Sequence, residues 1–304
     1  TDKVFNEAVV IACTLVSSMN SYIEKRQFHT VVIDEAAQAL EPATWIPILK
    51  AERVVLAGDP FQLPPTVKSM EAAKEGLAIT LLEKCVERQQ RVQLLDTQYR
   101  MHEIIMGFSN TMFYEGKLKA DPSVAQWLLT LADSPDHRAL EFIDTAGCGF
   151  EEQTNDETRS HYNEEEYHIL RQHLDRLLTL STEEERARLS IGVISPYREQ
   201  VVTMQNKVRE DFDHYPDAHI DVDTIDSFQG QERDVIYISM VRSNDSGEIG
   251  FLKDTRRMNV AMTRARKKLV IIGDSATLAQ FPFYSRLLDY AEKHDGYTTA
   301  WEWM

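Results

Sequence analysis

Short apolar runs rich in β-branched residues recur along this chain, and longer stretches with helical spacing separate them. The runs occupy residues 9–15, 30–33, 53–57, 191–195, 221–224, 235–240 and 269–273. Most are apolar throughout, which is typical of strands buried on both faces of a parallel sheet. The helical stretches occupy residues 36–49, 76–87, 164–179 and 199–212. This alternation predicts an α/β fold with helices on both faces of parallel sheets.

Residues 164–179 show the clearest helical period. Their apolar side chains recur at helical spacing at Tyr167, Leu170, Leu174, Leu177 and Leu178. Asn163 precedes this stretch and Glu166 follows three residues later, which is the pattern of a capped helix start.

The length of 304 residues exceeds the roughly 100 to 200 residues that are usual for one domain, so we expect two domains. A break lies at about residues 114–160, where Gly, Pro, Asp and Ser mix with aromatics and no period is sustained. We expect a first domain over 1–95 and a second over 96–304, with an irregular insertion at about 114–160.

Composition restricts the class of protein. With 43% hydrophobic and 27% charged residues the chain is globular, and no apolar stretch approaches the ~18 residues that cross a bilayer, so no membrane partner is expected. The three cysteines are widely separated and fit neither a disulfide framework nor a zinc site, which favours an intracellular location, cytoplasmic or, in a eukaryote, nuclear. The net charge of -16 excludes a broadly basic nucleic-acid surface but permits a narrow basic groove.

Polar residues follow or precede several of the predicted strands. In open parallel sheets, ligands bind beyond the carboxyl ends of the strands, so these positions are candidates for a site. Asp34 and Glu35 follow one run, and the sequences "GDPFQLPP", "PYREQ" and "IDSFQGQERD" follow others, while "RRMNVAMTRARKK" precedes the run at 269–273. Taken singly, each of these sequences is equally consistent with ordinary turn or capping chemistry.

Together these residues complement one another chemically. Hydrolysis of a γ-phosphate needs a carboxylate that holds Mg²⁺, a group that activates water, a phosphate sensor and cations. Asp34 suits the metal, Glu35 suits the water, and Gln62 lies in a proline-stiffened loop that could report the γ-phosphate. Arg100 and Arg264 are planar donors for bidentate phosphate contacts, although Arg264 could also simply be part of a basic helix end.

Six sequence motifs occur in an order that resembles motifs II to VI of superfamily 1 helicases. They are "VVIDEAAQALEP", "VVLAGDPFQLPP", "QYRMH", "VISPYREQV", "VDTIDSFQGQERDVIYISMVRS" and "RRMNVAMTRARKKLVIIGD", and "VVIACTLVSS" resembles the motif before them. The most similar group is the one related to the nonsense-mediated-decay RNA helicase, senataxin and the Smubp-type helicases. The resemblance covers about residues 9–274 and implies two RecA-like domains of the P-loop NTPase fold. It further implies ATP hydrolysis between those domains and 5′ to 3′ travel on nucleic acid.

The resemblance also implies roles for individual residues. Asp34 would coordinate Mg²⁺, Glu35 would activate water, and Gln62 would contact the γ-phosphate of ATP. Arg100 and Arg264 would reach this phosphate from the second domain.

Two further sets of roles follow from the same resemblance. Gly230 and Glu232 would lie by the phosphates and sugar of the nucleotide. The residues nearest the nucleic-acid strand would be Thr14, Ser17, Pro65, Tyr197 and Thr224. The chain departs from the group at Glu103, which follows His102 where the group usually has proline, and we expect this to alter only the start of a helix.

The phosphate loop GxxxxGK[ST] does not occur in the sequence. The only Gly-Lys pair, Gly116-Lys117, is followed by Leu118, and Thr111 stands at the place of the first glycine. We therefore expect a carboxy-terminal portion of a helicase whose first domain is incomplete at its amino end, inactive alone but an ATPase in the full-length protein. The alternative is a non-motor nucleic-acid-binding or scaffold module that has lost the loop.

Three expectations about partners remain. Single-stranded DNA or RNA is the expected partner, and motifs that contact the backbone do not distinguish the two. A truncated first sheet would expose a strand edge through which the chain could self-associate. Helicases of this group are sometimes joined to nuclease domains, but no separate cluster of nuclease-like carboxylates stands apart from the ATPase motifs.

Overall fold

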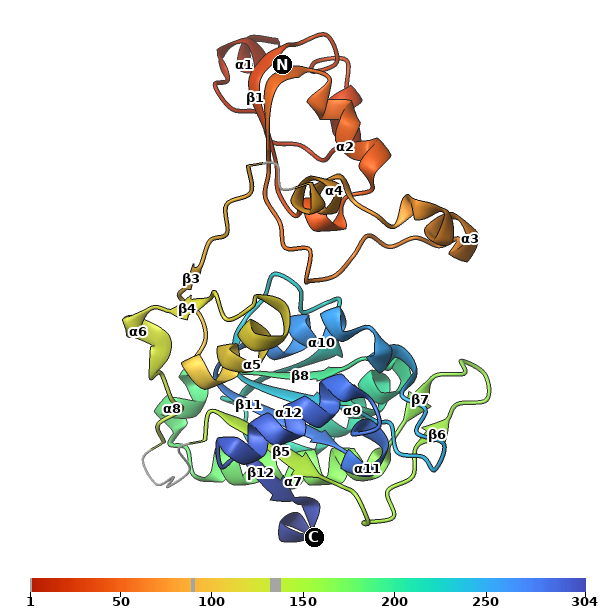
Figure 1. The fold of residues 1–304 in the computed structure, drawn as a ribbon. Coiled ribbons are helices and arrows are strands. Elements are labelled where there is room, and N and C mark those ends of the chain that lie inside the picture. Colours follow the sequence, from red (N-terminus) through yellow and green to blue (C-terminus); the bar gives the residue numbers. More distant parts are fainter. Residues whose placement is uncertain (1, 89–90, 132–137) are drawn as a thin grey trace. The chain divides into compact units, whose positions relative to one another are not determined.

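The computed structural model describes residues 2–88, 91–131 and 138–304, and the chain forms two compact units (Figure 1). Unit 1 spans Thr1–Leu94 and unit 2 spans Leu95–Met304. Each unit has its own parallel sheet. In the described part of the chain, no helix has the length and apolar character that a membrane span requires.

Unit 1 is built on two parallel strands, β1 (Phe28–Ile33) and β2 (Ala51–Leu56), with Val32 opposite Val55. The 3₁₀ turn η2 (Ala36–Gln38) and helix α2 (Glu41–Ile48) connect them. A small core of Ile33, Ala36, Ala37 and Leu82 joins this sheet to helix α4 (Leu81–Glu87). Thr80 and Glu83 form a capping box at the start of α4, which explains why the helix begins there.

The remaining elements of unit 1 are short. They are α1 (Asp2–Glu7), η1 (Val16–Met19), α3 (Met70–Ala72) and the π-helical turn η3 (Ala73–Leu77). Ser69 caps α3 through its side chain, which accepts a hydrogen bond from the Ala72 N–H.

The prediction of a strand at residues 9–15 is wrong. This segment has no regular structure, and Val9 and Val10 are 99% and 82% exposed. The prediction that β1 and β2 are buried on both faces is also wrong, because Val32 is 64% exposed and Val55 is 45% exposed. The physical reason is that apolar runs become buried strands only where neighbouring strands and helices cover them, and a two-stranded sheet supplies little cover.

Unit 2 contains a six-stranded sheet with the order β12-β5-β11-β10-β8-β9, in which all neighbours are parallel. Its strands are β5 (Leu140–Asp144), β8 (Ser190–Ser195), β9 (His219–Thr224), β10 (Arg233–Ser239), β11 (Ala265–Gly273) and β12 (Tyr297–Thr299). The predicted runs at 191–195, 221–224, 235–240 and 269–273 fall on four of these strands. The predicted α/β class with parallel sheets is therefore confirmed.

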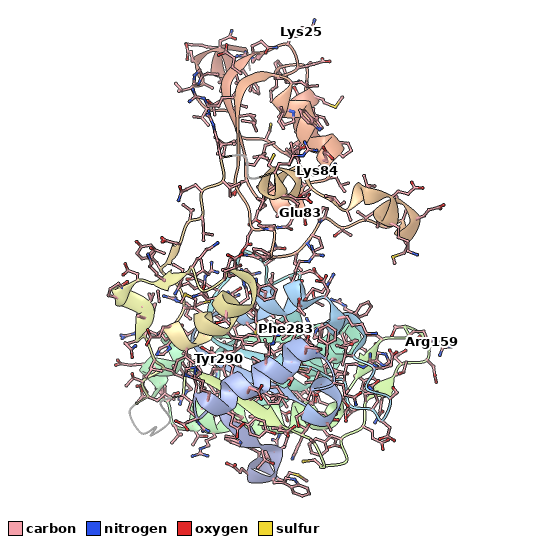
Figure 2. All side chains as sticks on the ribbon, viewed as in Figure 1. Lys25, Glu83, Lys84, Arg159, Phe283 and Tyr290 are labelled. Carbon is pink, nitrogen blue, oxygen red and sulfur yellow. The ribbon has the colours of Figure 1, made fainter. Side chains whose placement is uncertain are left out.

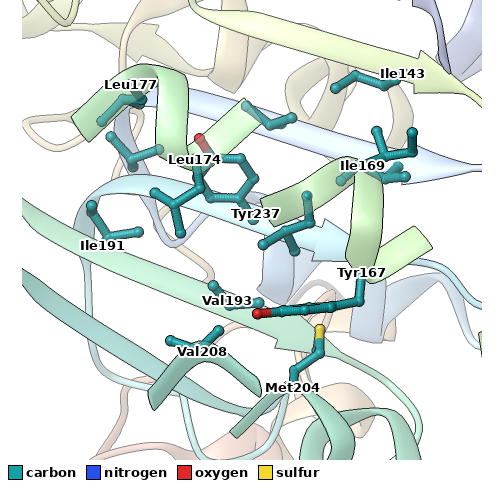
Figure 3. Packing of buried hydrophobic residues seen from close by; sticks show 14 of the residues in the cluster. Ile143, Tyr167, Ile169, Leu174, Leu177, Ile191, Val193, Met204, Val208 and Tyr237 are labelled. Atoms are coloured by element: carbon teal, nitrogen blue, oxygen red, sulfur yellow. The ribbon is translucent and has the colours of Figure 1, made fainter. Parts of the chain in front are cut away.

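Helices cover both faces of this sheet. On one side, α7 (Glu164–Thr179) and α9 (Arg198–Asp211) pack on Ile191, Val193 and Tyr237 (Figure 3). Because side chains alternate along a strand, Ile236 and Ile238 face the other side, and both are fully buried.

On that other side lie α5 (Glu103–Phe113), α10 (Thr255–Met262) and α12 (Pro282–Lys293). Phe283 and Tyr290 of α12 (Figure 2) pack on Phe108 of α5, with ring centroids 5.2 and 5.6 Å apart. At the start of α5, the His102 Nδ1 accepts a hydrogen bond from the Ile104 N–H at 3.1 Å. Glu103 lies in the first helical turn, where its negative charge is favourable, so the departure from the group's proline leaves a normal helix start.

The other elements of unit 2 are short. They are β3 (Thr97–Gln98), β4 (Lys119–Ala120), α6 (Pro122–Ala125), β6 (Gln153–Thr154), β7 (His161–Tyr162), α8 (Glu183–Arg188), η4 (Gly250–Lys253), α11 (Ser275–Leu278) and η5 (Ala300–Trp303).

The expectation of irregular structure throughout 114–160 does not hold, because β5 is an inner strand of the main sheet. The sequence hides it because charged Glu141 and Asp144 interrupt the apolar pattern. Glu141 is fully buried, with the Lys268 Nζ at 3.1 Å and the His173 Nε2 at 3.3 Å from its Oε2. Burial alone would raise the pKa of Glu141, but the His173 hydrogen bond and the charges of Lys268 and Arg138 lower it to about 2.

Glu166 is a second buried carboxyl group, and the donors to it are a hydroxyl group and a backbone N–H rather than cations. Asn163 caps α7 as predicted, through its side chain and the Glu166 N–H. The Glu166 side chain, however, accepts hydrogen bonds from the Ser239 Oγ at 2.6 Å and from the Val241 N–H at 2.8 and 2.9 Å. Val241 has a φ of 72°, a conformation that β-branched residues rarely adopt. Glu166 therefore holds the strained turn that follows β10.

We predict that Glu166→Gln changes how stability depends on pH. Burial raises the pKa of Glu166 to about 8 from an ordinary value of 4.5. Between these values the folded state binds more protons than the unfolded state, so the wild-type protein loses stability as pH rises through this window. Glutamine keeps an acceptor and does not titrate. The free energy of unfolding of Glu166→Gln, relative to wild type, should therefore increase between pH 5.5 and pH 8.5 in urea titrations.

The exposed neighbour Glu165 provides the matched control for loss of one carboxyl group. Glu165→Gln should follow the wild-type pH dependence, because its side chain is solvated in both states. A constant difference between Glu166→Gln and wild type across this pH range would contradict the account of the buried carboxyl.

Candidate functional site

Asp34 and Glu35 lie at the carboxyl end of β1, as predicted. Both residues are exposed, and Glu35 has a left-handed backbone with a φ of 50°. The Glu35 N–H donates a hydrogen bond to the Asp34 Oδ1 at 3.0 Å, and the Gln38 Nε2 donates one to the Glu35 Oε2 at 3.0 Å. The turn therefore presents two differently oriented carboxylates to solvent, and the Asp34 carboxylate suits a hard cation such as Mg²⁺.

The loop after β2 packs directly against this turn. The Ala36 N–H donates a hydrogen bond to the Ala57 carbonyl at 2.8 Å. A Cβ atom at Gly58 would come within 2.9 Å of the backbone nitrogens of both Ala36 and Ala37. Glycine is required here because two backbones approach closely, and this approach brings the two strand-end loops together.

Gln62 lies in this second loop. Its Nε2 donates a hydrogen bond to the Asp59 Oδ2 at 3.0 Å, and its backbone N–H donates one to the Asp59 carbonyl at 3.2 Å. The side chain is half-buried. Asp59 therefore orients the amide that the sequence predicts as a phosphate sensor.

The residues of unit 1 predicted to lie near nucleic acid differ in accessibility. Thr14 and Ser17 form one turn, with the Thr14 Oγ1 donating a hydrogen bond to the Ser17 Oγ at 2.7 Å, and both are exposed. Pro65, in contrast, is buried. Thr14 and Ser17 thus offer hydroxyl groups to a ligand, while Pro65 shapes its loop.

In unit 2, Arg100, Glu232 and Arg264 form one cluster at the amino ends of β10 and β11. The Arg100 Nε lies 2.7 Å from the Glu232 Oε2, and its Nη1 donates a hydrogen bond to the Thr263 carbonyl at 3.3 Å. Gly230, exposed and with a φ of 74°, lies two residues before Glu232. Four residues predicted to serve the nucleotide therefore come from three distant sequence segments to one edge of the sheet.

Arg264 is buried, with 2% of its surface exposed. Its Nε donates a hydrogen bond to the Val260 carbonyl at 3.0 Å, and its Nη1 donates one to the Gln231 carbonyl at 3.2 Å. Arg264 therefore closes the end of α10 and fixes the loop that carries Gly230 and Glu232.

The sequence reasoning missed Arg266, Lys267 and Trp127. The strand pairing shifts between Arg233 and Val235, so that Arg266 and Lys267 together oppose Asp234 in a β-bulge. The Lys267 Nζ lies 2.9 Å from the Asp234 Oδ1, and the Arg266 Nε lies 3.6 Å from the Glu232 Oε1. Both cations lie over the Trp127 ring, at 4.4 and 4.7 Å from its centroid.

Burial alone would raise the pKa of Asp234, but the hydrogen bonds from Lys267 and Ser190 outweigh it and lower the pKa. Asp234 is therefore an ionised anchor for the bulge. The only signal in the sequence was the basic stretch after Arg264, which does not reveal a bulge.

Thr224 and Tyr197 lie at the opposite, carboxyl edge of the same sheet. Thr224 ends β9, and its N–H donates a hydrogen bond to the Asp223 Oδ1 at 2.7 Å. Tyr197 precedes α9 and is 1% exposed, with its hydroxyl donating to the Ile249 carbonyl at 3.2 Å. The Tyr197 ring therefore does not reach the surface.

The candidate residues of unit 2 are thus divided between two edges. The loop 225–232 starts at the carboxyl end of β9 and ends at the amino end of β10, because both strands run in the same direction. The rule that ligands bind at carboxyl ends fits Asp34, Glu35 and Thr224, but it does not fit Glu232 and Arg264. Among the residues that the structure describes, no group of three or more His, Cys, Asp or Glu side chains could hold a metal ion.

Comparisons with known proteins place the chain in a family. A family model described as an AAA domain matches residues 77–276, and a second with the same description matches residues 1–70. The chain is 38% identical to DNA-binding protein SMUBP-2 of Mesocricetus auratus over 93% of its own length. It is 39% identical to DNA polymerase alpha-associated DNA helicase A of Saccharomyces cerevisiae over 83% of its length. It is 36% identical to an uncharacterized ATP-dependent helicase of Methanocaldococcus jannaschii over 96% of its length.

The chain spans only 28%, 39% and 43% of the lengths of these three relatives. One solved structure, the C-terminal domain of a possible DNA helicase from Lactobacillus plantarum, covers 66% of the chain with 13% identity and a TM-score of 0.35.

The matched models define an AAA-domain protein, a class that uses nucleotides, and the parallel sheets fit this class. Within this class the chain belongs to the superfamily 1 helicases of the Smubp-type group. The resemblance inferred from the ordered motifs is confirmed.

Proposed function

We propose that this chain provides motifs II to VI of an ATP-dependent helicase that moves along single-stranded DNA or RNA. The observation that carries the proposal is that each unit carries one of two chemically complementary groups of side chains. Unit 1 presents Asp34 and Glu35 beside the loop of Gln62, and unit 2 gathers Arg100, Glu232 and Arg264 at one sheet edge. Hydrolysis of ATP requires carboxylates and cations of this kind.

We propose the roles that the family motifs imply, and the positions of the side chains support them. Asp34 holds Mg²⁺, Glu35 accepts a proton from the attacking water, and Gln62 senses the γ-phosphate. When bound, Mg²⁺ neutralises charge that develops on the phosphates. Because no GxxxxGK[ST] sequence is present, the activity belongs to a protein that carries such a loop together with this chain.

Arg100 exchanges one anionic partner for another during the cycle. Its ion pair with Glu232 is partly exposed, because 34% of the Arg100 side chain and 43% of the Glu232 side chain are accessible. Pairs of this kind contribute little stability, so a phosphate can replace Glu232 at small cost. Glu232 and Gly230 then face the sugar and phosphates of the nucleotide, while Arg264 keeps their loop in place.

Nucleic acid is held through its backbone by hydroxyl groups at strand and turn ends. Thr14 and Ser17 provide them in unit 1, and Thr224 provides one in unit 2. Contacts of this kind position a strand without reading its sequence. The names of two relatives refer to DNA, and the 5′ to 3′ direction rests on the family resemblance alone.

The second candidate is a non-motor binding module, which the missing phosphate loop would favour if the full-length protein also lacks it. Such a module binds nucleic acid without hydrolysing ATP. The two functions are separated by hydrolysis in the full-length protein, with single-stranded DNA and RNA compared as stimulants.

We predict that Glu35→Gln in the full-length protein lowers the rate of nucleic-acid-stimulated ATP hydrolysis by about a hundredfold or more, because the proton acceptor is lost. ATP binding, measured with a fluorescent analogue, should persist because Asp34 still holds the metal. Glu52→Gln is the matched control, because Glu52 is an exposed glutamate near the amino end of β2, away from the carboxyl strand ends that carry the candidate site. Wild-type hydrolysis by Glu35→Gln would remove Glu35 from this role.

We also propose that the isolated chain self-associates through the β1–β2 sheet and resides in the cytoplasm or nucleus. Val32 and Val55 lie opposite each other on one face of the sheet and are exposed, and exposed apolar strand surface favours association between copies. The free cysteines suit a reducing compartment.

Size-exclusion chromatography of residues 1–304 tests the self-association. The apparent mass should increase with protein concentration, and a variant with Val32→Lys and Val55→Lys should elute as a smaller species. A clean monomer of the wild-type chain at high concentration would rule it out.

A further inference from the structure

An exposed aromatic side chain covers the buried Tyr197 at the carboxyl edge of the unit 2 sheet. Phe251 belongs to the turn η4 and is 66% exposed. Its ring centroid lies 5.7 Å from that of Tyr197, with an angle of 44° between the ring planes. Tyr197 was predicted to lie near the nucleic-acid strand, but Phe251 is the exposed ring at this place on the surface.

Gly250 allows this arrangement. It has a φ of 53°, and a Cβ atom there would lie 2.3 Å from the Arg242 Nη1 and 2.9 Å from the Tyr197 hydroxyl oxygen. Only glycine lets the backbone rest this closely on the two side chains. Because Gly250 packs against Arg242 and Tyr197, the backbone that leads into Phe251 is held in place.

The side chains beneath Phe251 are held by hydrogen bonds. Arg242 is 5% exposed, and its Nε donates a hydrogen bond to the Glu152 Oε2 at 2.8 Å. The same carboxylate oxygen accepts hydrogen bonds from the Ser243 N–H at 2.9 Å and from the Asn244 Nδ2 at 2.9 Å. Glu152 therefore links Arg242, Ser243 and Asn244, which follow β10, and Arg242 in turn contacts Tyr197 beneath the exposed Phe251 ring.

The surroundings of Phe251 fit a nucleic-acid strand. Tyr197 follows β8 and Thr224 ends β9, and these strands pair with Ser195 opposite Thr224. Two exposed cations lie close to these residues in sequence: Arg198 follows Tyr197, with its Nη1 4.0 Å from the Asp223 Oδ1, and Lys253 lies two residues after Phe251. An exposed ring, with cations in the neighbouring segments and a hydroxyl group at a strand end, is a combination suited to binding single strands without sequence preference.

We propose that Phe251 is a stacking platform for one base of single-stranded nucleic acid. The inference rests on the proposed function, because it needs a strand to pass along this edge. It adds a base contact to contacts that otherwise involve only the backbone. A ring that already packs against Tyr197 loses less freedom on binding than a fully solvated side chain would, and this favours stacking.

Binding measurements with the full-length protein test the proposal. The ligands are a fluorescein-labelled oligothymidine and an abasic strand of the same length. Phe251→Ala should weaken binding of the oligothymidine by about five- to one-hundred-fold, the range that loss of one stacked base gives. The same substitution should leave binding of the abasic strand unchanged, and Phe251→Trp should retain wild-type affinity for oligothymidine.

Trp301→Ala is the matched control, because Trp301 is 59% exposed and follows β12 at the other end of the strand order. It should bind both ligands as the wild type does. Thermal melting should show that Phe251→Ala is folded, since the lost side chain is mostly exposed.

The outcomes separate the two proposals. If wild type binds oligothymidine and Phe251→Ala binds it equally well, the stacking platform is refuted and the nucleic-acid function stands. If Phe251→Ala weakens binding of both ligands equally, Phe251 acts on the backbone and stacking is again refuted. If wild type binds neither ligand, nor the corresponding RNA, the nucleic-acid function itself fails, and the platform with it.

Discussion

The parallel pairing of all six strands in unit 2 is the constraint on which the rest of its structure depends. Parallel neighbours require crossover connections, so helices must cover both faces and every strand end must lie at one of two edges. Polar residues therefore collect at these edges. Arg100, Glu232 and Arg264 meet at the amino edge, while Thr224 lies at the carboxyl edge, and the loop 225–232 links the two. One loop thus connects the proposed nucleotide and nucleic-acid contacts.

Two carboxyl groups are buried against this sheet, and they differ in protonation. Glu141 remains ionised because Lys268 and His173 surround it, whereas Glu166 is held largely protonated near neutral pH by its burial. Glu166 accepts hydrogen bonds from the Val241 N–H in the turn after β10. Arg242, the residue after Val241, contacts Tyr197 and the turn that carries Phe251. A protonated glutamate is therefore the internal anchor for the surface at which we place a stacked base.

The sequence predicted what local pattern determines. Helix α7 spans the predicted residues 164–179, and β1, β2, β8, β9, β10 and β11 coincide with apolar runs. The patterns failed where tertiary contacts decide the structure. In β5, distant Lys268 neutralises the buried Glu141, and residues 9–15 lack the cover that a strand needs. Among the proposed site residues, motif order predicted Asp34, Arg100 and Glu232. It could not reveal that Tyr197 is buried or that a bulge brings Arg266 to Glu232, because both depend on segments far apart in the chain.

The central claim is that the cluster at the amino edge of unit 2 serves ATP hydrolysis, and Arg100 is its most accessible cation. The most direct measurement is the turnover number of the full-length protein carrying Arg100→Ala, at saturating ATP and single-stranded nucleic acid. Arg257→Ala, which breaks an exposed pair with Asp226 in the same loop region, is the control. The account predicts a loss of about a thousandfold for Arg100→Ala with an unchanged melting temperature, and near wild-type turnover for the control. Wild-type turnover by Arg100→Ala would contradict it.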